Sequence, residues 1–85
     1  MTQNELDILK AGDVLRIANP KSPAAASQRT KIESIYTPIP GVRVAHCSYY
    51  QVVGGKVYPL RDNSNDCELN VNLFGGDELL PEGSL

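Results

Sequence analysis

The sequence lacks several features that mark familiar classes of protein. Its 85 residues include no tryptophan and only one histidine, one phenylalanine and one methionine. No apolar run approaches the roughly 18 residues that cross a bilayer, so we predict no membrane span. The first ten residues, MTQNELDILK, lack the basic and apolar regions of a secretory signal. We therefore predict a cytoplasmic protein.

Cysteine is scarce as well. Cys47 and Cys67 are too few for a disulfide framework, and they have no CxxC partner or histidine-rich neighbour that would indicate zinc. We predict two buried thiols, with a single Cys47–Cys67 bridge as the alternative for an exported protein. The sequence also has no phosphate-binding loop, dinucleotide glycine pattern or paired-carboxylate motif, so we expect no cofactor and no metal.

His46 and Cys47 are adjacent and suggest a Cys/His nucleophile. Neighbouring side chains of a strand point to opposite faces, so we expect Cys47 to face inward and His46 outward, out of reach of each other. An acid–base pair of His46 with Tyr36 or Asp62 in a cleft is the alternative. We predict no catalytic residues and a protein that is not an enzyme.

The charge is unevenly distributed along the chain. Residues 1–61 hold all eight bases and four acids, a net of +4, whereas residues 62–85 hold six acids and no base, a net of −6. Such a division occurs where an acidic segment meets a basic partner, or where a segment neutralises its own domain. The acids here are scattered and form no block, which favours self-neutralisation.

The length and the ordinary composition, 41% hydrophobic and 21% charged, predict one packed domain over residues 1–85. At its start, Thr2 and Glu5 fit a capping box, and Leu6 and Leu9 form a narrow apolar stripe. We expect a short helical segment over residues 1–12 that must dock on the rest of the domain, because two turns are not stable alone.

From Asp13 the pattern alternates in the way typical of a strand. Leu15 and Ile17 share one face while Arg16 points the other way. The segment Asn19–Ser27, NPKSPAAAS, has two prolines and small residues and is predicted to be an exposed loop.

A second strand is predicted over residues 28–37. Ile32 and Ile35 fall on opposite faces there, which implies a bulge or burial of both sides. The segment 38–41, Pro-Ile-Pro-Gly, predicts a rigid turn into a long central strand over residues 41–53.

Gly54 and Gly55 separate two β-type runs and predict a two-residue hairpin, since both central positions of such a turn need positive φ. This turn places Pro59 at a position that makes no hydrogen bond within the hairpin and suggests an edge strand. The predicted pairs are Val53 with Lys56, Val52 with Val57, and Tyr50 with Pro59.

The segment 67–74, CELNVNLF, alternates cleanly and predicts a last strand. After it, Gly75 and Gly76 break the pattern, and we expect an acidic tail over residues 75–85 with one turn that packs Leu79 or Leu80. The predicted β-barrel thus covers residues 13–74. Four residues of the last strand are expected to face the core: Cys67, Leu69, Val71 and Leu73.

Together these segments predict a mostly β fold, a small SH3-like antiparallel barrel of about five strands with a short N-terminal helix. An open, twisted sheet with the helix across one face is the alternative. The layout over residues 11–61 is similar to the plasmid-borne type II dihydrofolate reductases, whose tetramer builds an active pore around a Val-Gln-Ile-Tyr stretch. The matching stretch 55–58 is Gly-Lys-Val-Tyr. Lys56 replaces the glutamine that recognises the ligand, so the resemblance implies a fold and not that activity.

Four tyrosines on strands predicted to pair are typical of a surface that binds peptides or stacks nucleic acid bases. We predict a non-catalytic interaction or accessory protein, of the kind found in bacteria, phages or mobile elements, that binds another protein. An SH3-like nucleic-acid-binding protein is the alternative, although a negative net charge disfavours it. A small enzyme or a ligand-binding homo-oligomer is the third possibility. The predicted partner-binding residues are Tyr36, Tyr49, Tyr58, Arg43 and Lys56.

Overall fold

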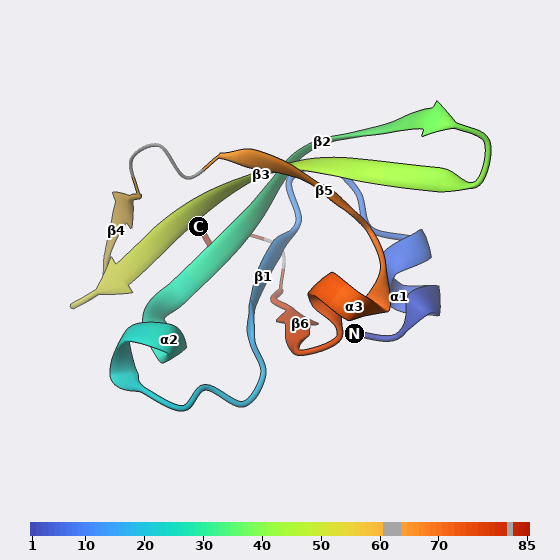
Figure 1. The fold of residues 1–85 in the computed structure, drawn as a ribbon. Helices are drawn as coiled ribbons and strands as arrows, with labels where there is room; N and C mark the ends of the chain where they lie inside the picture. Colours follow the sequence, from blue (N-terminus) through green and yellow to red (C-terminus); the bar gives the residue numbers. More distant parts are fainter. Residues whose placement is uncertain (61–63, 82) are drawn as a thin grey trace.

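The computed structural model describes residues 1–60, 64–81 and 83–85 of the chain. Within these ranges one antiparallel sheet forms the body of the molecule, and three short helices pack at its ends (Figure 1). The helices are α1 (Gln3–Asp7), α2 (Pro23–Ser27) and α3 (Val71–Phe74). The strands are β1 (Val14–Ile17), β2 (Gln28–Ile39), β3 (Val42–Val53), β4 (Lys56–Pro59), β5 (Asn65–Glu68) and β6 (Asp77–Leu79).

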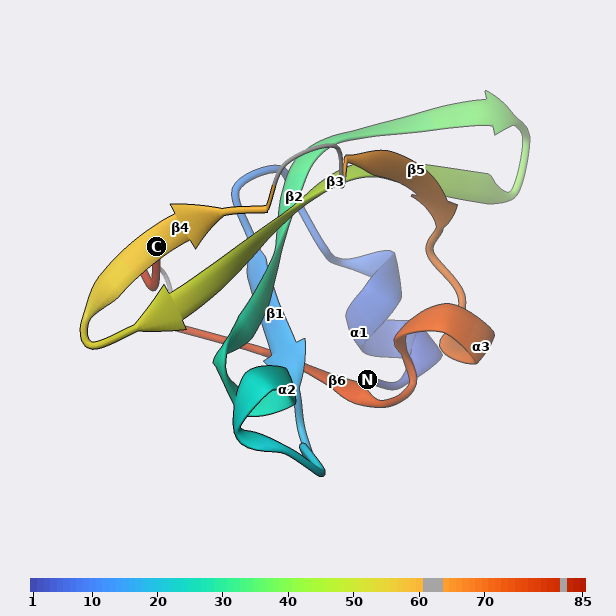
Figure 2. The ribbon, with the colours of Figure 1, turned by 60° about the vertical axis from the view of Figure 1, so that its left-hand side comes forward.

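The sheet has the strand order β4-β3-β2-β1-β6, and β5 pairs with the first half of β3. The long strands β2 and β3 form a hairpin that crosses the whole molecule (Figure 2). Among the described strands the sheet does not close on itself: β6 is one edge, and β4 and β5 share the other. A mostly β antiparallel fold is therefore confirmed, whereas the closed barrel is not.

The short N-terminal helix is confirmed, including its cap. The Thr2 backbone N–H donates to the Glu5 carboxylate at 2.8 Å, and the Glu5 N–H donates to the Thr2 hydroxyl at 3.2 Å. Leu6 and Leu9 are buried as predicted. They join a core on the inner face of the sheet, and the buried members of that core are Leu6, Leu9, Leu15, Ile32, Ala45, Cys47, Leu69 and Phe74.

The predicted hairpin register is confirmed. Val53 pairs with Lys56, Val52 with Val57 and Tyr50 with Pro59, and both turn glycines have positive φ. The predicted bulge is also present, because the pairing of β2 with β3 shifts between Ile32 and Ser34. With this bulge between them, Ile32 is buried in the core and Ile35 packs against it, partly buried.

Two segments expected to be irregular are partly ordered. The region 19–27 was predicted to be a loop, but its second half is α2, where Pro23 starts the helix and the Ser22 hydroxyl accepts a hydrogen bond from the Ala25 N–H at 3.1 Å. The turn expected over residues 38–41 is shorter, since β2 continues to Ile39, which pairs with Val42. Gly41 supplies the positive φ of that turn.

The prediction of one strand over residues 67–74 is wrong. β5 ends at Glu68, and the Asn70 side chain accepts a hydrogen bond from the Leu73 N–H at 3.1 Å, which caps α3. The change of period leaves Val71 and Leu73 about half exposed, at 46% and 58%, and buries Phe74 instead. Cys67 and Leu69 precede the change, and they pack with the core as predicted.

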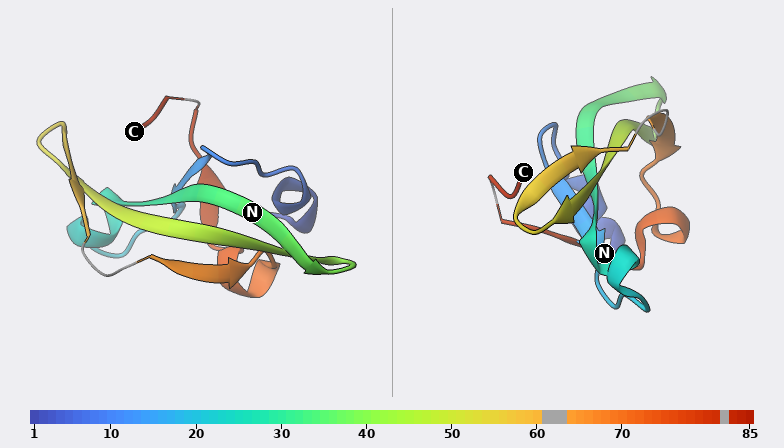
Figure 3. Two further views of the ribbon diagram at one scale, coloured as in Figure 1. Left: turned by 90° about the horizontal axis from the view of Figure 1, so that it is seen from above. Right: turned by 90° about the vertical axis from the view of Figure 1, so that its left-hand side faces the viewer.

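The expected turn in the C-terminal tail is also replaced, because residues 77–79 form β6 on the free edge of β1. The Ala18 N–H donates to the Gly76 carbonyl, and the Leu80 N–H donates to the Val14 carbonyl, each at 2.9 Å. These bonds pair backbone groups along the edge of β1 that would otherwise lack hydrogen-bond partners in the sheet. Figure 3 shows β6 running beside β1 before the chain turns away. No helix of the described residues is long and apolar enough to span a membrane.

Candidate functional site

A pocket of about 290 Å³ lies on the inner face of the sheet, between its two edges. β1 and β6 form one wall and β5 with α3 the other, while β2 and β3 form the floor. We call it the seam pocket because it occupies the opening between β6 and β5. The residues that line it are Arg16, Ile17, Gln28, Thr30, Tyr49, Cys67, Leu73, Phe74 and Asp77.

Asp77 places a half-buried carboxylate in this pocket. Loss of hydration raises its pKa above the ordinary value of 3.8, an effect that the nearby N-terminal ammonium of Met1 partly opposes. That ammonium donates to the carbonyl of Asp77 at 2.8 Å and to those of Phe74 and Gly75. Within the described ranges, no group donates a hydrogen bond to the Asp77 carboxylate itself.

The other described acids of the C-terminal part do have side-chain partners. The Glu78 carboxylate lies 2.5 Å from the Arg16 Nε, and Glu68 accepts a hydrogen bond from the Asn70 amide at 3.2 Å. Asp66 is bonded to the His46 ring. The expected self-neutralisation of the domain is thus seen at Glu78 and Arg16, and Asp77 is left without such a partner.

Tyr49 reaches the seam pocket from β3. Its hydroxyl donates to the Asn65 side chain at 2.6 Å and lies 4.0 Å from the Cys67 Sγ. The pKa of Tyr49 is raised to about 12, mainly by burial and next by the nearby thiols of Cys67 and Cys47. Burial likewise raises the pKa of Cys47 to about 12. Both groups are protonated at neutral pH and supply no nucleophile there.

The two thiols are not bridged. Cys47 is fully buried as predicted, whereas Cys67 is only partly buried because it lines the seam pocket, and both thiols are free. The prediction that Cys47 faces inward and His46 outward is confirmed, since the His46 side chain is 43% exposed on the other face. The adjacent pair therefore cannot act together.

His46 instead belongs to a polar cluster on the outer face. Asp66 on β5 lies opposite it, and the Asp66 carboxylate approaches His46 Nδ1 at 2.6 Å and accepts from the Tyr36 hydroxyl at 2.7 Å. These bonds lower the pKa of Asp66, with His46 the larger cause and Tyr36 the next, and the bond from Tyr36 raises the pKa of that phenol. Asp66 thus links Tyr36 and His46, whereas Asp62, the other partner considered, lies outside the described residues.

Ser34 is the cross-strand neighbour of His46 on the other side, which places a serine, a histidine and an aspartate in one row across β2, β3 and β5. Among the described residues, no hydrogen bond joins Ser34 to the imidazole. An engaged nucleophile would need that bond. The bonds that do exist tie β5 to β2 and β3, so the cluster stabilises the pairing of the short strand β5.

The predicted partner-binding residues are not brought together. Tyr49 lines the seam pocket and Tyr36 is on the opposite face of the sheet. Tyr58 and Lys56 lie on the exposed edge strand β4. Arg43 is used within the molecule: its guanidinium donates to the carbonyls of Leu6 and Leu9, each at 2.8 Å.

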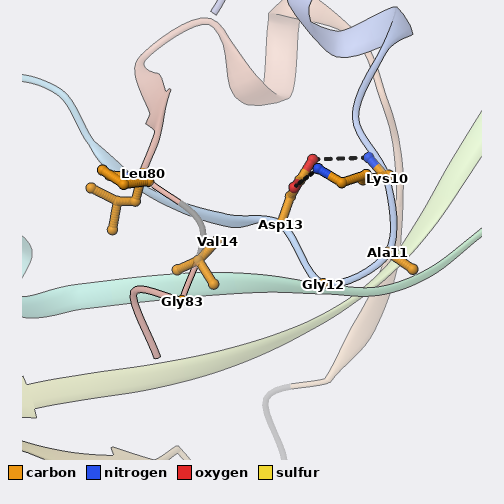
Figure 4. Close-up of a pocket in the computed structure, with 8 residues that line it drawn as sticks. Lys10, Ala11, Gly12, Asp13, Val14, Leu80 and Gly83 are labelled. Carbon is orange, nitrogen blue, oxygen red and sulfur yellow. Dashed lines mark hydrogen bonds and ion pairs between the residues drawn. The ribbon is translucent and has the colours of Figure 1, made fainter.

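A smaller pocket of about 70 Å³ lies where the C-terminal segment passes the turn before β1 (Figure 4). Asp13 closes that turn, because its carboxylate accepts from the Lys10 N–H at 2.9 Å and from Nζ at 3.1 Å. Leu80 and Gly83 face Val14 across the pocket. The C-terminal segment thus covers Val14, which is buried although it lies on the face opposite to Leu15.

No arrangement of three or more histidine, cysteine, aspartate or glutamate side chains suitable for a metal ion occurs within residues 1–60, 64–81 and 83–85. No protein family, curated protein or solved structure matches the chain. Of the residues that line the seam pocket, Tyr49 alone was among the predicted partner-binding residues. Among those that sequence reasoning missed are the acid Asp77, the amide Gln28 and the hydroxyl Thr30. They meet only because β6 pairs with β1, and no local pattern signals that pairing.

Proposed function

We propose that this chain is a non-catalytic binding module that holds a segment of another protein in the seam pocket. The observation that carries the proposal is the pocket itself, an indentation between the two sheet edges with apolar walls and a few polar groups. Such a combination is typical of binding sites, in which apolar groups supply affinity and polar groups supply orientation. The apolar lining comes from Ile17, Leu73 and Phe74.

The exposed rim of the pocket favours binding of a partner protein. Leu73 lines the pocket and is 58% exposed, so its side chain is available to a second surface. An exposed leucine beside a pocket gains free energy when a partner covers it. Tyr49 at the floor gives an amphipathic contact of the kind enriched at protein interfaces.

The alternative, a nucleic-acid-binding protein, has less support. Of the described bases, Lys10, Arg16 and Lys31 are each within 4.0 Å of a carboxylate. Pairing of this kind reduces the positive potential that attracts phosphates. Filter binding to single-stranded and double-stranded DNA and RNA at low salt tests it, and salt-sensitive retention would favour this alternative.

A displayed library of random peptides, selected on the immobilised protein, tests the proposed module. Leu73→Ala removes the rim side chain, and Val71→Ala is its matched control, because Val71 is on the same helix and 46% exposed but does not line the pocket. We expect the selected peptides to bind Leu73→Ala about tenfold more weakly, the effect of losing a contact worth about 1.4 kcal/mol. Binding to Val71→Ala should equal that to the wild type.

Two outcomes would contradict the proposal. One is that no peptide is enriched above a blank surface. The other is that Leu73→Ala binds the selected peptides as tightly as Val71→Ala and the wild type do. Native mass measurement in parallel shows whether a second copy of the chain is the occupant, which would make the module a homo-oligomer.

A further inference from the structure

We infer that the seam pocket takes a protonated amine on an aliphatic stem, the lysine side chain of a partner protein, with its ammonium at the Asp77 carboxylate. This inference rests on the proposed function for the source of the lysine. Its chemical part, recognition of an aliphatic ammonium, rests on the pocket alone.

The charge in the pocket is the first argument. Asp77 is the described acid of residues 62–85 that lacks a side-chain partner, and it is half-buried in the pocket lining. The Met1 ammonium offsets part of the cost of desolvating this carboxylate but donates no hydrogen bond to it, and a cation that does donate relieves the rest. A neutral ligand would worsen the desolvation, and an anionic ligand would add repulsion.

The two cations near the pocket make their hydrogen bonds elsewhere. Arg16 also lines the pocket, and its Nε donates to the Glu78 carboxylate at 2.5 Å. The Met1 ammonium donates to the carbonyls of Phe74, Gly75 and Asp77, and so its donors are directed to the backbone. Neither group donates to the Asp77 side chain, so the carboxylate keeps its acceptor sites for a ligand.

The walls match the rest of the ligand. Ile17, Leu73 and Phe74 offer an apolar surface beside the carboxylate. A lysine side chain has a four-carbon stem that packs on apolar surface while its ammonium seeks acceptors. The oxygens of Gln28 and Thr30, also in the lining, are additional acceptors for the three ammonium protons.

The small probe n-butylammonium chloride tests the chemical part, with 1-butanol as the neutral analogue of nearly equal shape. Titrations followed by amide chemical shifts compare the wild type with Asp77→Asn and with Glu68→Gln. Glu68 is an exposed acid on β5 outside the seam pocket, so its variant controls for the change in net charge. We expect n-butylammonium to shift the amides of pocket residues in the wild type and in Glu68→Gln. The affinity of Asp77→Asn should be at least about tenfold lower, and 1-butanol should bind weakly in every case.

Equal binding of n-butylammonium to Asp77→Asn and to the wild type would overturn the inference, as would equal binding of 1-butanol and n-butylammonium. If Asp77→Asn does not fold, replacement of lysine by norleucine in selected peptides makes the same comparison on the wild-type protein. Here a loss of at least about tenfold is expected, and no loss would refute the role of the ammonium.

Different experimental outcomes refute the binding module and the lysine site. Peptides that depend on Leu73 but contain no required lysine would leave the binding module standing and reject the lysine. Binding of n-butylammonium without any enriched peptide would reject the module and leave a site for small amines.

Discussion

The sequence predicts that Arg43 binds a partner, whereas in the structure Arg43 binds the backbone at the end of α1 and just after it. Replacement of Arg43 tests this structural role. Its guanidinium donates one hydrogen bond to the Leu6 carbonyl and one to the Leu9 carbonyl, each at 2.8 Å. The Leu6 carbonyl is in the last turn of α1 and also accepts from the Leu9 N–H at 3.3 Å, whereas the Leu9 carbonyl lies two residues beyond the helix and has no other donor among the described residues. Arg43→Ala removes both charged donors, which leaves the Leu9 carbonyl without a described partner and the Leu6 carbonyl with the Leu9 N–H alone.

The expected cost follows from these contacts. A buried acceptor left without a donor costs about 1–3 kcal/mol, and carbonyls that are only partly buried recover some hydration. We therefore expect about 1 kcal/mol for each bond and about 2 kcal/mol in total. Domains of this length have a free energy of unfolding of about 4–13 kcal/mol, so the loss is a substantial fraction. The melting temperature should fall by about 8–16 °C.

Urea unfolding followed by far-UV circular dichroism measures this change, with Lys56→Ala as the control. Lys56 lies on the exposed strand β4, and among the described residues it makes no ion pair, so its replacement should change stability by less than about 0.5 kcal/mol. A lower urea midpoint with an unchanged slope for Arg43→Ala is the expected result. If Arg43→Ala matched Lys56→Ala, the anchoring role would be refuted and Arg43 would again be a candidate for partner binding.

Two further predictions concern the cysteines and the outer polar cluster. At pH 8 the native protein should react with a thiol reagent at Cys67 well before Cys47, because Cys47 is fully buried and its pKa is raised to about 12. Mass spectrometry of the labelled peptides locates the label, and equal rates at both thiols would contradict this. Asp66 has a lowered pKa in the folded state, so its bonds to His46 and Tyr36 stabilise the fold above the ordinary value of 3.8 and are lost as the pH falls below it. The stability difference between wild type and Asp66→Asn, measured by urea unfolding, should therefore be larger at pH 7 than at pH 3, and a constant difference would count against the cluster.

Much of the fold follows from short-range patterns. The capping box at Thr2 and Glu5 and the hairpin at Gly54 and Gly55 depend on residues a few positions apart, and both were predicted correctly. The opposite directions of His46 and Cys47 follow from the period of a strand in the same way.

The errors lie where a local pattern admits two answers. The alternation in residues 67–74 fits a strand, but the Asn70 cap and the turn at Gly75 and Gly76 make a helical turn there. That choice buries Phe74 beside Leu69 in place of Val71 and Leu73, and it is made by packing. Closure of the barrel is not confirmed, since among the described strands β6 and β5 do not pair and the seam pocket lies between them.

The candidate site was only partly predictable. Tyr49 was chosen for its residue type and does line the seam pocket, whereas Tyr36 belongs to the outer cluster. Asp77 appeared only as one acid of an acidic tail. Its place in the pocket depends on the pairing of Ile17 with Asp77, across 60 positions of the sequence.

By itself, the sequence determined the elements whose hydrogen bonds close within a few residues: the capped helix, the glycine hairpin and the alternating faces of the long strands. Only the tertiary structure decided which edge β6 covers, whether the sheet closes, what Arg43 binds and where the Asp77 carboxylate lies. The physical reason is the separation in the sequence between the groups that bind each other. A cap or a turn is satisfied by neighbours in the chain, whereas an edge strand, a buried carbonyl or a half-buried carboxylate is satisfied by whatever the folded chain brings to it.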